Sequence, residues 1–296
     1  RDFVTAAFVS GNAHFGSSQI AQGFAHYNQP SDQEMRDERD RLTRYRPADR
    51  TTNMVIEWYE QQTAQAPLFL WVHYYDPHNP LNPPAIHIGD VEPSNDSEMK
   101  KLTRFLVEEH RSDLTRRNSV KRIISYDAEI RFVDTQIERL YESIETKNSS
   151  LNTLWVVTSD HGQGLSNHNW FGHHRHIYNE QLHVPLFFYF SSGEVKSRIV
   201  EDLVEHVDVP VTILELLGTG LYDGMNMPQG RSLVPLMAGN TTHEHKQLAF
   251  SERRRLLTPR TNAPPHRRAA YEAGERYSLQ SRDAKYLWFS EGPDEF

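Results

Sequence analysis

The sequence predicts an α/β fold in which a mainly parallel central sheet is flanked by helices. Short, mostly apolar runs at residues 5–10, 68–74 and 154–157 each end in turn-forming residues, which is typical of buried parallel strands. Between these runs lie longer segments whose apolar residues recur at helical spacing. The third run leads directly into Asp160 and His161, at the strand end where α/β sheets bind their ligands.

Two helices are expected between the strands. Thr52 can cap the first, which is predicted to run to about residue 65, and Ser119 can cap a longer one that ends near residue 145. The second helix carries acidic side chains that we assign to its solvated face, namely Asp127, Glu129 and Asp134. Its predicted apolar stripe consists of Ile123, Ile130, Val133, Ile137, Leu140 and Ile144. Residues 81–118 are expected to form a loop with one short helix over the mouth of a site.

Six histidines, at positions 161, 168, 173, 174, 176 and 183, crowd the stretch between two apolar runs at residues 152–190. Adjacent strand residues point to opposite faces, so Asp160 and His161 can approach one ion only where the strand turns. Gly162 is expected to permit that turn by adopting a positive φ. A carboxylate and an imidazole together are ligands for divalent metals. The alternative is a helix-capping Asp160 beside a surface histidine.

Three motifs in a fixed order resemble the sulfatases of the alkaline phosphatase superfamily. They are S-D-H-G at residues 159–162, Gly172-His173, and Y-x-E-x-x-x-V-P at residues 178–185. The resemblance implies an alkaline-phosphatase-like sandwich at residues 1–240 and a small C-terminal antiparallel subdomain at residues 241–296. Strand-like pieces at residues 247–251, 277–281 and 285–290 fit that subdomain.

The resemblance also implies roles for particular side chains. Asp160 and His161 would bind a divalent metal, for which calcium is usual in the family and Mn²⁺ or Zn²⁺ remain open. His173 and His78, the latter in the segment VHYYDPHNP, would contact the sulfate and protonate the leaving oxygen. His14, in GNAHFG, would lie near the nucleophile, although Asn12 replaces the lysine that the family has there. A shift of one residue would give the role of His173 to His174.

The family's nucleophile, a formylglycine made from Cys or Ser in C/S-x-P-S-R, has no counterpart in these residues. We therefore expect the nucleophile and the first metal-binding Asp pair to lie upstream of Arg1, in a longer polypeptide. On that view the 296 residues alone are expected to be inactive and to bind metal weakly. The resemblance implies export to the periplasm or the cell exterior.

The composition of the chain limits which kinds of partner and site are expected. Hydrophobic residues make up 37% of the chain, enough for a globular core, and no apolar run approaches the ~20 residues of a membrane span. The formal net charge of −8 gives no support for nucleic-acid binding. The absence of cysteine rules out disulfides and a Cys-ligated zinc site. No feature of the sequence indicates an oligomeric state.

The function predicted from these observations is metal-dependent hydrolysis of a small-molecule or glycan sulfate ester. The pair Asp160–His161, where many sulfatases have Asp–Asn, keeps open a phosphonate monoester or phosphodiester hydrolase of the same superfamily. Asn12 in place of lysine keeps open a relative that binds metal or glycan without catalysis.

Overall fold

The chain folds as two compact units, residues 1–151 and 152–296, in a computed structural model. Each unit is described by itself. The residues that the structure describes are 3–11, 19–31, 33–35, 45–62, 66–107, 113–147, 152–173, 175–193, 195–219, 229–239, 247–254 and 274–295.

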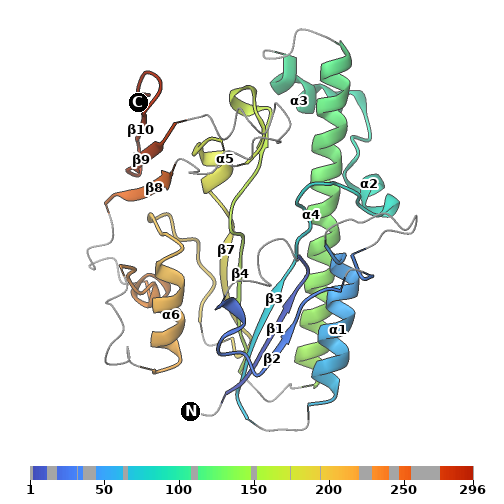
Figure 1. The fold of residues 1–296 in the computed structure, drawn as a ribbon, viewed down its shortest axis with the longest axis vertical. Coiled ribbons are helices and arrows are strands. Elements are labelled where there is room, and N and C mark those ends of the chain that lie inside the picture. The colour runs from blue at the N-terminus through green and yellow to red at the C-terminus, as the bar shows by residue number, and fades with distance from the viewer. Residues whose placement is uncertain are drawn as a thin grey trace. The chain divides into compact units, whose positions relative to one another are not determined.

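A parallel three-stranded sheet forms the core of the first unit. Its order is β2 (His26–Asn28), β1 (Val4–Val9) and β3 (Leu68–His73), and both neighbours run parallel to β1 (Figure 1). The side chains of residues 6–9 in β1 are at most 1% exposed. The alanines, phenylalanine and valine of this run thus form a strand covered on both faces, and the predicted parallel sheet is confirmed.

Helices α1 (Ala48–Glu60) and α4 (Asp113–Lys147) pack side by side next to this sheet (Figure 1). The helix expected from Thr52 begins four residues earlier, after Pro47, and Thr52 is buried within it, where its hydroxyl bonds that of Tyr74 at 2.8 Å. The fixed φ of Pro47 suits a helix start, so the proline decided the boundary. Short 3₁₀ turns, η1 (Gln19–Ala21) and η2 (Asn167–Asn169), occur in the first and second units.

Helix α4 differs from its expected form in two respects. It begins at Asp113, so Ser119 lies inside the helix and is buried rather than capping it. The predicted stripe is confirmed at Ile123, Leu140 and Ile144, which are buried, but Ile130 is 45% exposed while Glu129 is 1% exposed. Phe132 and Gln136 are buried on the same side as Glu129. The assignment of Glu129 to the solvated face was therefore wrong.

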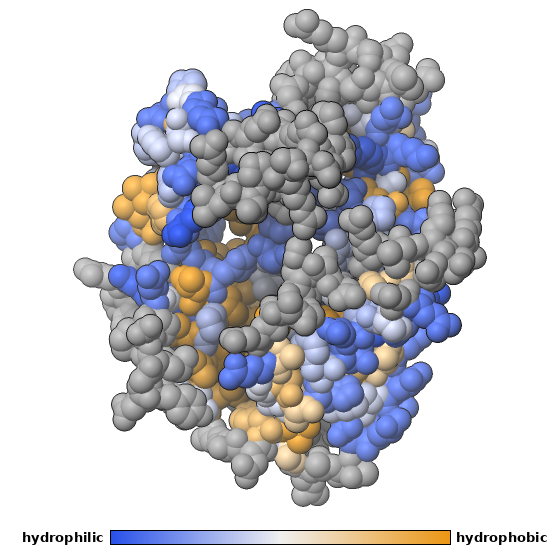
Figure 2. Space-filling model, viewed as in Figure 1, coloured by the Kyte–Doolittle hydropathy of each residue, from blue (hydrophilic) through white to orange (hydrophobic). Residues whose placement is uncertain are grey.

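Two helices, α2 (Ala85–Val91) and α3 (Asp96–Val107), lie within the segment expected to be a loop with one helix. Both contact α4. Asn95 is the N-cap of α3. Its side-chain oxygen accepts hydrogen bonds from the backbone N–H groups of Ser97 and Glu98, each at 3.0 Å. The outer side of the first unit, over α1 and α4, is largely hydrophilic (Figure 2), as expected for helices that bury only one stripe.

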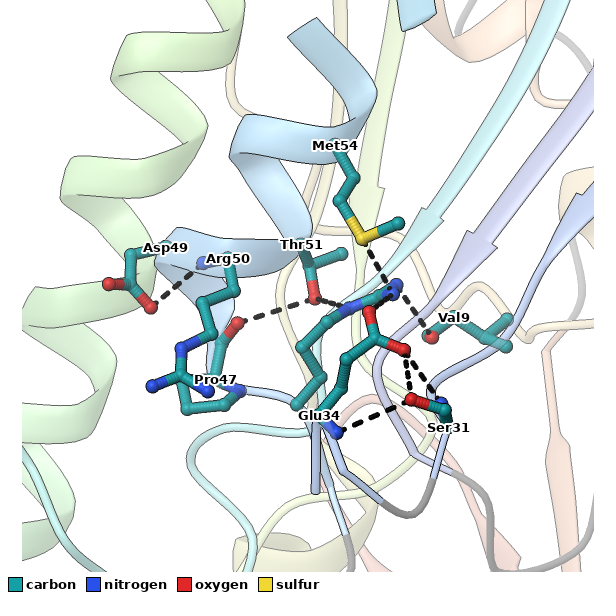
Figure 3. Close-up of polar contacts among 9 residues, drawn as sticks. Val9, Ser31, Glu34, Pro47, Asp49, Arg50, Thr51 and Met54 are labelled. Carbon is teal, nitrogen blue, oxygen red and sulfur yellow. Dashed lines mark hydrogen bonds and ion pairs between the residues drawn. The ribbon is translucent and has the colours of Figure 1, made fainter. Parts of the chain in front are cut away.

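Arg46 is completely buried where β1 ends and α1 begins. Its guanidinium donates to the carbonyl of Val9 at 3.2 Å, to Thr51 Oγ1 at 3.1 Å and to Glu34 Oε1 at 3.1 Å. Figure 3 shows these acceptors converging from the strand, the helix and the intervening loop. Ser31 holds the Glu34 carboxylate through its backbone N–H and its hydroxyl, at 2.8 and 2.7 Å. This network fixes the carboxyl end of β1 against α1.

The second unit contains β4 (Leu154–Thr158), which pairs with β7 (Leu186–Phe190) in an antiparallel ladder. The apolar run of β4 was interpreted as a parallel strand, and for its pairing within this unit that interpretation is wrong. An apolar run cannot reveal strand direction, because both kinds of buried ladder select the same residue types. A two-stranded hairpin, β5 (Gly164–Leu165) and β6 (Phe171–Gly172), and the one-turn helix α5 (Asn179–Leu182) lie between β4 and β7 in the chain.

Helices α6 (Asp208–Leu216) and α7 (Val234–Met237) follow. The chain then forms an antiparallel sheet of order β10-β9-β8, with β8 (Ala249–Arg253), β9 (Arg276–Gln280) and β10 (Lys285–Phe289). The expected C-terminal antiparallel strands are thus confirmed, and a boundary at residue 240 remains a prediction. Among the described residues, no helix combines the length and apolar character that crossing a membrane requires.

Candidate functional site

The turn after β4 brings a carboxylate and an imidazole together. Asp160 Oδ1 accepts the backbone N–H of His161 at 2.9 Å, and its side chain is 79% exposed. The Nδ1 atom of His161 lies 2.8 Å from the carbonyl oxygen of Gly162, so this nitrogen carries the proton. The lone pair is then on Nε2, which lies 3.6 Å from Asp160 Oδ2. Two potential metal ligands from adjacent residues therefore face the same point.

A glycine is required at position 162 because the backbone of α5 approaches it closely. The positive φ expected from the sequence is not observed at this residue. Its N–H donates to the carbonyl of Gln181 at 2.9 Å. A Cβ on this residue would lie 2.2 Å from the carbonyl oxygen of Glu180. The absence of a side chain lets the turn pack directly on α5, which fixes the position of Asp160 and His161.

His173 joins this pair from the end of β6. Gly172, with φ at 123°, turns the chain just before it. The His173 ring stacks on that of His161 with centroids 4.2 Å apart and an interplanar angle of 25°. Its Nδ1 lies 3.1 Å from Gln163 Oε1, so Nδ1–H donates a hydrogen bond to the amide oxygen and the ring lone pair is on Nε2. Asp160, His161 and His173 thus form one cluster, which we call the strand-end cluster.

A second set of contacts supports the hairpin that carries His173. His168 has a left-handed backbone, with φ at 53°, and its Nδ1 lies 2.9 Å from Glu180 Oε1. Its ring stacks on Tyr178 at a centroid distance of 3.6 Å. The Tyr178 hydroxyl donates to Glu295, and burial together with that carboxylate raises its pKa to about 12. Tyr178 and Glu180, known from the sequence only as motif residues, therefore hold the hairpin in place.

His78 lies in the first unit, in the loop that follows β3. Its backbone N–H donates to the carbonyl of Tyr75 at 2.9 Å, and its ring lies 4.4 Å from the Tyr75 ring between centroids. Its Nδ1 is 2.6 Å from the carbonyl oxygen of Asn79, which again leaves the lone pair on Nε2. The Tyr45 hydroxyl donates to the Pro80 carbonyl at 3.3 Å. The loop is thus fixed at several points along its backbone.

Two buried carboxyl groups next to this loop were missed by sequence reasoning. Asp76 is 5% exposed and Glu129 is 1% exposed. Burial raises the pKa of Asp76 to about 8, with a further contribution from the charge of Glu129. Burial likewise raises the pKa of Glu129 to about 7. In this loop the sequence predicted a role for His78 alone, and helical periodicity placed Glu129 on the solvated face of α4.

The structure therefore brings together Asp160, His161 and His173, and it places His78 in the other unit. His14 and His174 lie outside the described residues, so their predicted roles stay predictions, as does the meeting of His78 with Asp160. Among the residues that the structure describes, no group of three or more Asp, Glu or His side chains is arranged to hold a metal. Asp160 and His161 fit a divalent cation by donor type, as two ligands of a larger set.

Comparison with known proteins identifies one family. The family model described as Sulfatase matches residues 2–219. An arylsulfatase of Clostridium perfringens is 24% identical over 271 residues, which cover 84% of this chain and 50% of that protein. Human iduronate 2-sulfatase is 25% identical over 219 residues, covering 65% of this chain and 39% of that protein. The chain thus spans about half the length, or less, of the curated relatives that it matches.

Solved structures share the fold. The phosphonate monoester hydrolase of Agrobacterium radiobacter superposes with a TM-score of 0.69 at 18% identity, over 99% of this chain and 70% of that one. A protein solved in complex with its substrate D-glucosamine-2-N,6-O-disulfate gives a TM-score of 0.69 at 19% identity, over 99% and 72% of the two chains. At these identities the likeness establishes the alkaline-phosphatase-like α/β fold, and the predicted fold class is confirmed.

Proposed function

Because this chain belongs to the sulfatase family, we propose that it carries the metal-binding and sulfate-binding residues of an enzyme that hydrolyses sulfate esters. The observation that carries this proposal is the strand-end cluster, in which a carboxylate oxygen and two imidazoles gather at one turn. A sulfate monoester is an anion, and its hydrolysis requires positive groups around the transferring sulfur and a proton for the leaving oxygen.

His173 is suited to the proton-transfer role. Gln163 Oε1 accepts a hydrogen bond from Nδ1–H, so Nε2 is the atom at which His173 gains or loses a proton. His161, stacked on it at 4.2 Å, would stay neutral when bound to a cation, so that only one of the two rings carries a charge. A protonated His173 then donates to a sulfate oxygen or to the leaving oxygen.

Asp160 and His161 would hold the divalent metal. When bound, the metal would supply positive charge that neutralises a sulfate oxygen and lowers the pKa of a bound hydroxyl. Calcium prefers oxygen ligands, whereas an imidazole ligand suits Mn²⁺ or Zn²⁺. We propose calcium from the family habit, and the imidazole of His161 makes Mn²⁺ and Zn²⁺ the alternatives to test. Only two ligands are present in the strand-end cluster, so we expect weak metal binding by these 296 residues alone.

The remaining roles complete the proposal. His78 would bind the sulfate or its leaving oxygen, and His14 would lie near the nucleophile. The nucleophile would be a formylglycine supplied from outside these residues, since none of them matches C/S-x-P-S-R. A glycan sulfate ester is the proposed substrate class. Its support is the name of one relative, iduronate 2-sulfatase, and the disulfated glucosamine bound to one structural neighbour.

The test is steady-state kinetics of the protein with its nucleophile segment, using phenyl sulfate. We expect Asp160→Asn and His173→Gln each to lower kcat/KM by about 10²-fold or more, because each removes a charge-stabilising or proton-donating group. Added metal should partly restore Asp160→Asn and should not restore His173→Gln. His206→Gln, a change at an exposed histidine just before α6, serves as the matched control and should be neutral. Full activity in both site variants would refute the assigned roles.

A phosphonate monoester hydrolase is the second candidate, favoured by the Asp160–His161 pair itself. Turnover of phenyl sulfate and of a phenyl phosphonate monoester by the same preparation separates the two. A preference for the phosphonate by orders of magnitude would replace the sulfatase proposal. Stoichiometric metal binding without turnover of either ester would instead indicate a non-catalytic relative.

A further inference from the structure

Two carboxyl groups lie buried in the first unit, next to the loop that carries His78. Asp76 precedes His78 by two residues, and Glu129 projects from α4. Each has one oxygen, Asp76 Oδ2 and Glu129 Oε2, that is buried and has no hydrogen-bond partner within the described part of the chain. Neither is ion-paired to any described residue. Burying two unpaired carboxylates is costly, so a proton is the simplest neutralising partner.

The second oxygen of Glu129 holds the end of the loop. Glu129 Oε1 accepts the backbone N–H of Asn82 at 2.6 Å. The backbone N–H groups of Asp76 and of Ala48, the first residue of α1, partly lower the pKa of Asp76, against burial and the charge of Glu129, which raise it. Glu129 therefore ties the loop of His78 to α4, and Asp76 lies beside the start of α1.

The electrostatic surroundings of the pair are negative or neutral. Burial, the charge of Glu129 and then the charge of Asp49 raise the pKa of Asp76. The hydroxyl groups that face the pair stay protonated: burial raises the pKa of Tyr45, and burial raises that of Tyr74 to about 12. Arg139 acts on Tyr74 and partly opposes that shift. No described cation offsets a second negative charge at this place.

We propose that Asp76 and Glu129 together retain one proton at neutral pH, and that Glu129 is a positioning residue that fixes the His78 loop through Asn82. The catalytic consequence rests on the proposed function, in which His78 binds an anion. With one proton retained, Asp76 and Glu129 together carry a single negative charge, and His78 in the adjacent loop can then still bind a sulfate anion. When pH rises, the shared proton leaves to solvent, the pair acquires a second charge, and both the loop and the anion site are weakened.

The first experiment does not depend on catalysis. It measures the unfolding equilibrium of the full chain by urea titration at a series of pH values. The unfolded carboxyl groups are ionised above about pH 5, whereas the folded Asp76 and Glu129 stay protonated until the pH approaches their raised pKa values of about 8 and about 7. Unfolding therefore releases up to about two protons near pH 5–6 and about one near pH 7. We expect the unfolding constant to rise by up to about a hundredfold per pH unit near pH 5–6 and by about tenfold per unit near pH 7, and to level off above about pH 9.

Asp76→Asn and Glu129→Gln each remove a titrating group, and Glu129→Gln keeps the oxygen that accepts from Asn82. Each variant should flatten this pH dependence, whereas Glu138→Gln, an exposed change on the same helix, should preserve it. The infrared carbonyl band of a protonated carboxylic acid should be present in wild type at neutral pH and vanish on alkalinisation. If the unfolding constant had the same pH dependence in wild type and all three variants, and no carbonyl band of a protonated acid were seen, the proposal that the pair retains a proton would be overturned.

The second experiment tests positioning in the active protein. Glu129→Leu removes the acceptor for Asn82, and we expect it to lower kcat for phenyl sulfate by about tenfold or more while the protein stays folded. Glu129→Gln should retain more activity and extend the alkaline limb of the pH profile. A purely structural role would lower stability in Glu129→Leu without moving the pH profile of either variant. If wild type hydrolyses no ester, the proposed function fails while the unfolding experiment still decides the shared proton.

Discussion

Arg46 provides the most direct test of how the first unit is held together. Its guanidinium is completely buried and bonds the carbonyl of Val9, the hydroxyl of Thr51 and the carboxylate of Glu34. Replacing Arg46 with Met keeps apolar volume but removes the charge and every donor. Breaking a buried ion pair by removing one partner costs about 3–5 kcal/mol.

The contacts around Arg46 place the expected loss of unfolding free energy near the lower end of that range. Glu34 is 33% exposed and keeps its two hydrogen bonds from Ser31, so its carboxylate can be rehydrated after the change. The carbonyl of Val9 and the hydroxyl of Thr51 would lose a buried partner, at about 1–3 kcal/mol each before relaxation. We therefore expect Arg46→Met to lower the free energy of unfolding by about 3–4 kcal/mol. Arg46→Lys keeps the charge but loses the planar fork, and should cost about half as much.

The assay is urea unfolding followed by circular dichroism, with the midpoint and slope compared between variants. Arg50→Met, an exposed change in the first turn of α1, is the matched control and should lie within about 0.5 kcal/mol of wild type. The pKa of Glu34 allows a second test, in which the free energy of unfolding is measured as a function of pH. Burial raises its pKa, but the bonds from Ser31 and Arg46 outweigh this and the net pKa is lowered.

A lowered pKa means that Glu34 stabilises the fold above about pH 4.5 and loses this effect as pH falls through the folded pKa. Arg46→Met should therefore also reduce the loss of stability in acid. The reasoning would be refuted by an Arg46→Met protein that unfolds within about 1 kcal/mol of wild type, because the buried network would then contribute nothing of note.

Three further changes test other parts of the chain. Lys147→Met should cost about 1–2 kcal/mol in urea unfolding, because the ammonium bonds the carbonyls of residues 59, 60 and 62 at 2.8, 2.7 and 3.2 Å and so closes the end of α1. Gly162→Ala should cost about 1–3 kcal/mol and weaken metal binding in calorimetry, since its Cβ would meet the carbonyl of Glu180 at 2.2 Å. His176→Gln should flatten the loss of stability between pH 6.5 and 4. Burial, followed by the charges of neighbouring arginines, lowers the pKa of His176 to about 4, so wild type loses about 1–2 kcal/mol as pH falls through that window.

Matched controls exist for the changes at Lys147 and Gly162. Lys121→Met removes an exposed lysine from the same helix as Lys147 and should be neutral. Gly89→Ala places a Cβ in open space within α2 and should stabilise the chain by about 0.5–1 kcal/mol. If Gly162→Ala behaved like Gly89→Ala, the close packing of the turn on α5 would not constrain the site. If Lys121→Met cost as much as Lys147→Met, the loss would reflect charge and not the contacts at the end of α1.

Much of the candidate site could be predicted from the sequence because strand ends leave a strong local signal. The apolar run before Asp160 and the turn residues after it indicated the pair Asp160–His161, and the resemblance to sulfatases added His173 to the same site. The structure brings these residues together. The parallel sheet was likewise predicted from its buried apolar strands, and β1 and β3 pair in parallel.

Other features depended on contacts between segments far apart in the chain. Gly162 was correctly taken as necessary, but the reason is the backbone of α5, 18 residues further on, and not its own torsion angle. The antiparallel partner of β4 was missed because an apolar run carries no information on direction.

The sequence by itself determined the family, the strand ends and the residue types of the site, since these are encoded within short stretches. Only the tertiary structure decided that Glu129 and Asp76 are buried and that burial raises the pKa of both. The physical reason is that the charge state of a side chain depends on what covers it. The cover of Asp76 and Glu129 comes from residues up to about 80 positions apart, brought together only when the first unit folds.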